Sequence, residues 1–190
     1  MKNINMKVAL VVGHDRENQG AYSEILSDPE YPFFLFLLSE ILSFSLLDFE
    51  AKLFHHMPFT SYTAKQKDTA RGTAGYDLVL EFHFNAFNEK ANGCEALYNS
   101  KNEHTRLFAS TFCELMSAKG FFNRGPKPID LKDDKEENGE GFLRLSKPNA
   151  VLLEPFFGDN EKDCKTFMDL GPDGFAKVLN DCVKIYKEHL

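Results

Sequence analysis

The feature that most constrains the fold is a set of short strands that are apolar on nearly both faces. The clearest lies within residues 76–87 (YDLVLEFHFNAF), and similar runs occupy residues 7–12 and 149–154. In a strand, successive side chains point to opposite faces, so a strand without a polar face is covered on both sides. Such strands are typical of the mostly parallel sheet of an α/β protein.

Helices and weaker strands are predicted between these buried strands. The pattern predicts helices at residues 32–47, 60–73, 102–119, 159–168 and 172–189, and strands at 48–54 and 93–98. The charged segment 123–141 predicts an exposed loop around one short strand. We expect a single domain over residues 1–190, built as a three-layer sandwich with helices on both faces of a twisted, mostly parallel sheet.

Charge and cysteine content exclude several classes of protein. The formal charge is −7 and the pI is near 5.4, so a chain that binds the phosphate backbone of nucleic acid is not expected. The four cysteines are scattered without a CxxC pair, which argues against a zinc ribbon or a disulfide framework.

Neither a signal peptide nor a transmembrane segment is expected. The first apolar run ends at Gly13 after about six residues, which is too short for a signal-peptide core. Residues 32–47 are interrupted by Glu40 and three serines and do not reach the roughly 20 apolar residues of a membrane span. We therefore expect a chain that is made in the cytoplasm and has no membrane partner.

Polar side chains stand at the carboxyl ends of the three buried strands. His14 follows the first strand, His83 and Asn85 end the second, and Glu154 ends the third. If the strands run parallel, these groups meet at one edge of the sheet, where sites form in open α/β folds. Glu30, on the connection that leaves the first strand, can fold back over the same edge.

This combination of side chains suits metal-assisted hydrolysis. Two neutral imidazoles and one carboxylate match a catalytic Zn²⁺, which keeps three protein ligands and leaves a fourth position for water. A remaining glutamate can then serve as the base that takes the proton of that water. For His83 alone, a buried histidine with a purely structural hydrogen bond is the competing interpretation.

Several segments lie along the chain in an order that matches a known family. They are VGH at 12–14 with GA at 20–21, EY at 30–31, RGTA at 71–74 through FHFNA at 82–86, GCEALY at 93–98, NRGPK at 123–127, and PNAVLLE at 148–154 through Asn160 and Asp163. The set resembles the zinc-dependent N-acetylmuramoyl-L-alanine amidases of the cell-wall amidase 3 type, over nearly the whole chain.

The resemblance implies a role for each matching residue. It implies that His14, Glu30 and His83 are zinc ligands and that Glu154 is the catalytic acid/base. The implied reaction is hydrolysis of the amide between N-acetylmuramic acid and L-alanine, with the stem peptide and muramic acid of peptidoglycan as binding partners. The chain would then act at the cell wall and is similar to a compact phage endolysin.

The sequence also departs from the family pattern at the site. The usual GHGG is GHDR here, and the serine that commonly stands two positions before the second histidine is Glu81. A carboxylate at that position could orient His83 from behind. We also expect Asn85 to orient its neighbours and Arg124 to contact the site or the substrate.

Some alternatives stay open for the carboxylates. Glu24 competes with Glu30 as the ligand from the first loop. The pattern Ser27-x-x-Glu30 also resembles a helix-capping box, although Pro32 would then fall inside the helix. Glu154 could instead be a buried acid that is paired with an arginine, either Arg71 or Arg124.

The adjacent histidines His55 and His56 cannot both bind a metal from a strand, because neighbouring side chains of a strand point to opposite sides. They are therefore interpreted as part of a solvated turn.

Two alternative functions stay open as well. One is a zinc peptidase or deacylase that acts on another amide, and the other is a non-catalytic wall-binding module with the same fold.

Overall fold

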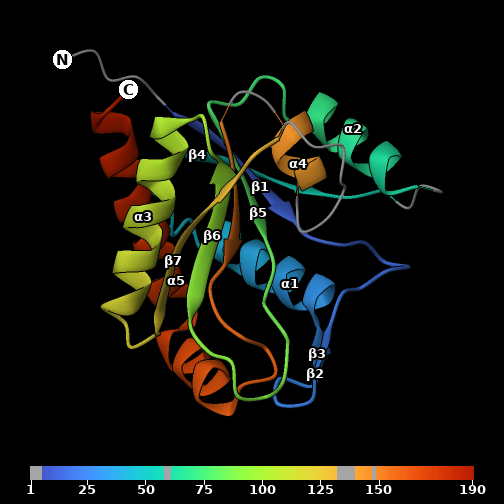
Figure 1. Cartoon of the computed structure of the whole chain (residues 1–190), viewed down its shortest axis with the longest axis vertical. Coiled ribbons are helices and arrows are strands. Elements are labelled where there is room, and N and C mark those ends of the chain that lie inside the picture. Colours follow the sequence, from blue (N-terminus) through green and yellow to red (C-terminus); the bar gives the residue numbers. More distant parts are fainter. Residues whose placement is uncertain (1–5, 58–60, 132–139, 147–148) are drawn as a thin grey trace.

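The computed structural model describes residues 6–57, 61–131, 140–146 and 149–190 and contains a six-stranded sheet (Figure 1). The strand order is β4-β1-β5-β8-β6-β7. The strands are β1 Lys7–Val12, β4 Glu50–His55, β5 Leu78–Phe82, β6 Cys94–Asn99, β7 Asn123–Ile129 and β8 Ala150–Glu154. Strands β4, β1, β5 and β8 are mutually parallel, whereas β6 pairs antiparallel with β8 and parallel with β7. The predicted mostly parallel sheet is confirmed.

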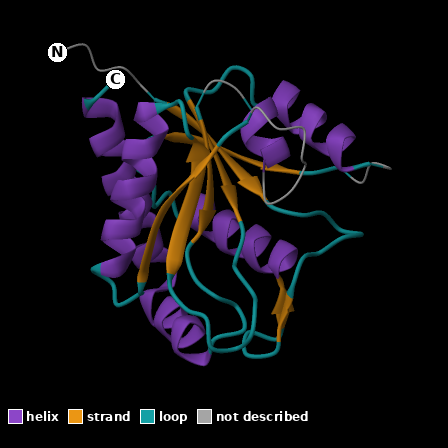
Figure 2. Cartoon of the chain, in the orientation of Figure 1, coloured by secondary structure: helices purple, strands orange, loops and turns teal. Residues whose placement is uncertain are grey.

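Helices cover both faces of this sheet (Figure 2). Helices α1 (Glu30–Ser43), α3 (Glu103–Ser117) and α5 (Glu161–Glu188) pack on one face, and α2 (Tyr62–Gly72) and α4 (Glu140–Leu145) lie together on the other. Alternate strand residues divide accordingly, since Leu78 and Leu80 join the first core cluster and Val79 the second. The three-layer prediction is therefore confirmed, and none of the described helices is long and apolar enough for a membrane span.

Several element boundaries differ from the sequence-based prediction. Helix α1 begins at Glu30 rather than at residue 32, so its first residue is a predicted site residue. Helix α5 contains a break at Gly171 (φ 63°, ψ 178°), which separates the two closing helices that the pattern predicts. The predicted loop at 123–141 begins with the seven-residue edge strand β7 and ends with the first residues of α4, while residues 132–139 lie outside the described part.

A small second sheet shapes the connection between β1 and α1. Strands β2 (Tyr22–Ser23) and β3 (Asp28–Pro29) pair antiparallel, an element that the sequence analysis did not predict. The Ser23 hydroxyl donates to the Gly158 carbonyl in the turn after β8, at 2.5 Å between the oxygens. The hairpin thus fixes the chain just before Glu30 against the carboxyl edge of the large sheet.

Candidate metal centre

His14 reaches the sheet edge through two glycines that permit unusually close packing. The residue follows β1 in a left-handed conformation (φ 65°), and the preceding Gly13 N–H donates to the Phe82 carbonyl at 3.0 Å. A Cβ atom on Gly13 would lie 2.3 Å from the His83 ring, and one on Gly20 would lie 2.6 Å from the His14 ring. Only glycine therefore allows the two imidazoles to lie this close to the backbone.

Glu30 is held by backbone donors at the start of α1. Its carboxylate accepts hydrogen bonds from the Ala21 N–H at 3.0 Å and the Phe84 N–H at 3.3 Å. Its Oε2 atom also lies 3.3 Å from His14 Nε2 and 3.2 Å from His83 Nδ1. The residue before α1 is Pro29, which makes no side-chain cap, so the proposed Ser27 capping box does not form.

The ligand atoms of His14, Glu30 and His83 all lie within 4.8 Å of one another. Two imidazoles and a carboxylate are a donor set that fits a catalytic Zn²⁺. The His14 side chain retains 33% exposure, so the cluster is open to solvent on one side. Glu24, the competing carboxylate, is exposed and is not part of this cluster.

Opposite charges dominate the electrostatics of this cluster. Burial alone would raise the pKa of Glu30, but hydrogen bonds and attraction from His14 and His83 lower it to about 2. Burial would likewise lower the pKa of His83, but hydrogen bonds and attraction from Glu30 and Glu81 raise it to about 10. A metal that binds here therefore has to displace a proton from His83.

Behind His83 lies a second buried carboxylate. Glu81 is 2% exposed, and its Oε1 atom lies 3.1 Å from His83 Nε2 and 3.3 Å from His56 Nε2. Burial would raise the pKa of Glu81, but these two imidazoles lower it to about 2. The interpretation of the 55–56 pair as a solvated turn is wrong for His56, which is 4% exposed because α2 covers it; His55 is exposed.

Glu154 lies at the same edge in a different environment. The Asn85 amide donates both to Glu154 Oε2 and to Glu95 Oε1, the second bond at 3.0 Å. Glu95 also accepts a 2.7 Å hydrogen bond from Arg124 Nε. Arg124 thus pairs with Glu95 and not with Glu154, while Arg71 is exposed on the last turn of α2. Asn85 contacts this acid pair rather than His83.

The two carboxyl groups of this pair affect each other. Burial, a hydrogen bond to Glu95 and repulsion from Glu95 raise the pKa of Glu154 to about 8. Burial opposes ionisation of Glu95 too, but hydrogen bonds from Glu154, Arg124 and Asn85 lower its pKa. In the metal-free protein at neutral pH, Glu154 therefore holds a proton while Glu95 is charged.

Sequence reasoning assigned no role to Glu95 or His56. Glu95 stands at the amino end of β6, which reaches the site because β6 runs antiparallel to β8 and places Glu95 opposite Glu154. Its position in the family-like GCEALY segment was the available signal. His56 follows an edge strand, and nothing in its local sequence indicates that α2 packs over it.

The change from GHGG to GHDR has a structural consequence. Asp15 is fully buried, and its Oδ1 atom accepts hydrogen bonds from the N–H groups of Glu17 and Asn18 at 2.8 and 3.0 Å. Its other oxygen pairs with Lys65 of α2. Asp15 thereby anchors the loop that follows His14 to α2.

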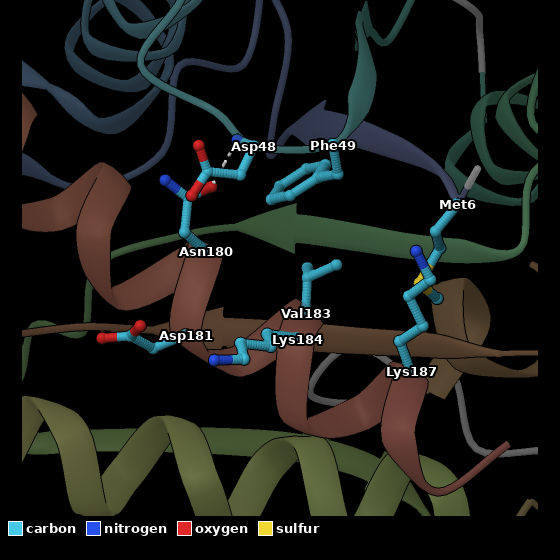
Figure 3. Close-up of a pocket in the computed structure, with 8 residues that line it drawn as sticks. All are labelled: Met6, Asp48, Phe49, Asn180, Asp181, Val183, Lys184 and Lys187. Atoms are coloured by element: carbon cyan, nitrogen blue, oxygen red, sulfur yellow. Dashed lines mark hydrogen bonds between the residues drawn. The ribbon is translucent and has the colours of Figure 1, made fainter. Parts of the chain in front are cut away.

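A pocket elsewhere on the molecule contains none of the predicted site residues. It lies between α5 and the segments that precede β1 and β4 (Figure 3). Its lining residues are Met6, Asp48, Phe49, Asn180, Asp181, Val183, Lys184 and Lys187. Because these segments lead into the amino ends of β1 and β4, the pocket is at the sheet edge opposite the His14–Glu30–His83 cluster.

The family model described as N-acetylmuramoyl-L-alanine amidase (Amidase_3) matches residues 8–171. This chain belongs to that family. The amidase match covers every residue of the cluster and of the Glu95–Glu154 pair, and it confirms the resemblance that the sequence motifs indicated. No curated protein sequence matches the chain.

Solved structures agree with this assignment. The catalytic domain of the CD27L endolysin, which targets Clostridia difficile, is 28% identical, with 94% of this chain and 96% of that one covered and a TM-score of 0.75. The CwlD amidase from Clostridioides difficile, solved in complex with the GerS lipoprotein, is 20% identical, with 98% and 100% covered and a TM-score of 0.74. The catalytic domain of CwlV, an amidase from Bacillus (Paenibacillus) polymyxa var. colistinus, is 19% identical, with 96% and 99% covered and a TM-score of 0.71.

The family assignment establishes the class of reaction. As an N-acetylmuramoyl-L-alanine amidase, the chain hydrolyses the amide bond between N-acetylmuramic acid and L-alanine in peptidoglycan. The geometry of the cluster is compatible with metal assistance to that hydrolysis, since its three donor groups lie within 4.8 Å of one another.

Proposed function

We propose that His14, Glu30 and His83 bind Zn²⁺ and that Glu154 transfers the proton during amide hydrolysis. The observation that carries this proposal is the convergence of the three donor groups within 4.8 Å at the sheet edge where Glu154 also lies. The separation of the carboxylates into two environments supports different roles for Glu30 and Glu154.

Each side chain contributes a separate part of the chemistry. A bound Zn²⁺ would polarise the scissile carbonyl and make water a better nucleophile. Glu154 takes a proton from the attacking water and passes it to the departing nitrogen of L-alanine. Its pKa near 8 suits this exchange, because a group that both accepts and donates works best with a pKa close to the working pH.

The neighbours of Glu154 hold the carboxyl in place and keep its pKa close to the working pH, so that it can both accept and release a proton. Asn85 fixes the carboxyl through its amide, and its own backbone N–H donates to the Phe156 carbonyl at 3.0 Å. Arg124 holds Glu95 in the charged form, and the charged Glu95 disfavours ionisation of Glu154. We propose that Asn85 and Arg124 are positioning residues of this acid pair.

We propose that the site takes the muramic acid and stem peptide of peptidoglycan and that the enzyme acts in lysis of the cell wall. The likeness to an endolysin catalytic domain, at 28% identity, supports the lytic role. The partly exposed side chain of His14 gives a large polymer access to the cluster.

The proposal is tested by metal analysis combined with peptidoglycan digestion. The purified enzyme should contain one zinc per chain and release new N-terminal alanine from peptidoglycan, and chelation should stop that release. Glu24→Gln is a matched control, because it removes an exposed carboxylate from the same loop region as Glu30. Release of other amino termini without alanine would instead identify a peptidase, and zinc-free protein with full activity would overturn the zinc proposal.

A further inference from the structure

Three buried polar side chains extend from His83 into the layer between the sheet and α2. Glu81 comes from β5, His56 follows β4, and Thr69 comes from α2. Their exposures are 2%, 4% and 6%. Burying a carboxylate, an imidazole and a hydroxyl costs free energy unless each group forms a hydrogen bond. The contacts among the three side chains therefore show how this cost is offset.

The contacts form an unbranched chain that ends at the metal cluster. Thr69 Oγ1 lies 2.8 Å from His56 Nδ1, and His56 Nε2 lies 3.3 Å from Glu81 Oε1. The same Glu81 oxygen lies 3.1 Å from His83 Nε2. The other Glu81 oxygen has no hydrogen-bond partner among the described residues, so both imidazoles act on one carboxylate oxygen.

The contacts of a charged Glu81 determine which ring nitrogens carry hydrogen. A carboxylate only accepts hydrogen bonds, so the contacts of Glu81 with His56 and His83 require hydrogen on the Nε2 atom of each ring when Glu81 is charged. If His56 is neutral, its Nδ1 then bears the lone pair and accepts the hydroxyl hydrogen of Thr69. For a neutral His83, the lone pair lies on Nδ1, the atom that faces Glu30 at 3.2 Å.

We propose that Glu81, His56 and Thr69 are positioning residues that hold the His83 ring with its Nδ1 lone pair toward the metal cluster. This inference rests on the proposed function, because it assigns these residues a purpose only if the cluster binds metal. A carboxylate behind a ligating histidine fixes the ring and its tautomer and makes the imidazole a better donor.

The chain offers a matched pair of histidines for the test. His56 is buried in the chain of contacts, whereas its neighbour His55 is exposed. Zinc affinity is measured by chelator competition for the wild type, Glu81→Gln, His56→Ala, Thr69→Val and the control His55→Ala. Thr69→Ser keeps the hydroxyl and should rescue what Thr69→Val loses. Thermal unfolding of the metal-free variants shows separately whether each still folds.

We expect zinc to bind about 10–100-fold more weakly in Glu81→Gln and, by a smaller factor, in His56→Ala and Thr69→Val. His55→Ala and Thr69→Ser should keep the wild-type affinity. In ¹⁵N NMR spectra of the zinc-bound wild type, His56 should show the Nε2–H tautomer, and its ring signals should shift in Thr69→Val.

Two different failures can be distinguished. A wild type that binds no zinc would overturn the proposed metal centre itself. A wild type that binds zinc, together with folded Glu81→Gln and His56→Ala variants of unchanged affinity, would leave the metal centre intact and overturn the positioning role. A His56 ring that carries its hydrogen on Nδ1 would also contradict the inference.

Discussion

Glu30 and Glu154 are two glutamates at the same edge of one sheet, but their neighbours drive their pKa values in opposite directions. Glu30 faces two imidazoles, which lower its pKa to about 2. Glu154 is buried beside Glu95, which helps to raise its pKa to about 8. The comparison shows that the neighbours, not the residue type, separate a carboxylate suited to bind a cation from one suited to hold a proton.

The largest effect is expected from removing the charge of the carboxylate in the imidazole cluster. Glu30→Gln should reduce the release of N-terminal alanine from peptidoglycan to the background rate, because a neutral amide is a much poorer partner for a cation between His14 and His83. Glu24→Gln should keep full activity. Substantial activity in Glu30→Gln would show that the Glu30 carboxylate is not needed as a ligand, and the distinction between the two glutamates would fail.

A smaller but still large loss is expected at the other glutamate. Glu154→Gln should lower the rate of alanine release by about 10²–10⁴-fold, which is the usual contribution of a positioned acid/base group. The residual rate should remain above that of Glu30→Gln, because the donor cluster is untouched. Equal activities of Glu154→Gln and wild type would show that another group moves the proton.

The close approach of the backbone to His83 can be tested through stability. Gly13→Ala places a Cβ atom 2.3 Å from the His83 ring, so the ring or the backbone of residue 13 has to shift. We expect the free energy of unfolding to fall by about 1–3 kcal/mol in denaturant titrations. Gly75→Ala is the matched control, since a Cβ there meets no atom within 4 Å. Equal losses in both variants would contradict the packing argument.

The smallest effect concerns the acid pair. Glu95→Gln removes the charge that opposes ionisation of Glu154, so the pKa of Glu154 should fall from about 8 toward the ordinary value of 4.5. Carboxyl ¹³C NMR of the metal-free protein measures it directly. A pKa that stays near 8 would show that burial alone sets it.

The same shift has a consequence for stability with a defined sign. Between pH 4.5 and 8 the unfolded chain has lost the Glu154 proton while the folded protein keeps it, so metal-free wild type loses stability as pH rises through this window. Metal-free Glu154→Gln has no titratable carboxyl at this position and should lose less stability between pH 4.5 and 8. Parallel stability curves for the two proteins would contradict the assignment.

The site residues that stand at the ends of strands could be predicted from the sequence. His14, His83 and Glu154 stand at the ends of strands that are buried on both faces, a pattern typical of parallel strands, and on that condition their convergence could be predicted. The position of Glu30 depended on the family resemblance, because a loop of about 15 residues and the small β2–β3 sheet place it.

The residues that sequence reasoning missed depend on tertiary packing. Glu95 reaches Glu154 because β6 runs antiparallel to its neighbour, and strand direction is not encoded in a six-residue segment. His56 is buried because α2 lies over the end of β4, and among the described residues the hydrogen-bond partners of Glu81 are that histidine and His83. Local patterns cannot predict such contacts between distant segments.

The most direct test of the division between the two glutamates is the zinc content of Glu30→Gln and Glu154→Gln, purified side by side and measured by elemental analysis. The different environments of the two carboxylates predict that Glu154→Gln retains one zinc per chain and that Glu30→Gln loses it. Zinc retained by Glu30→Gln, or lost from a folded Glu154→Gln, would contradict the assignment of one glutamate to the metal and the other to the proton.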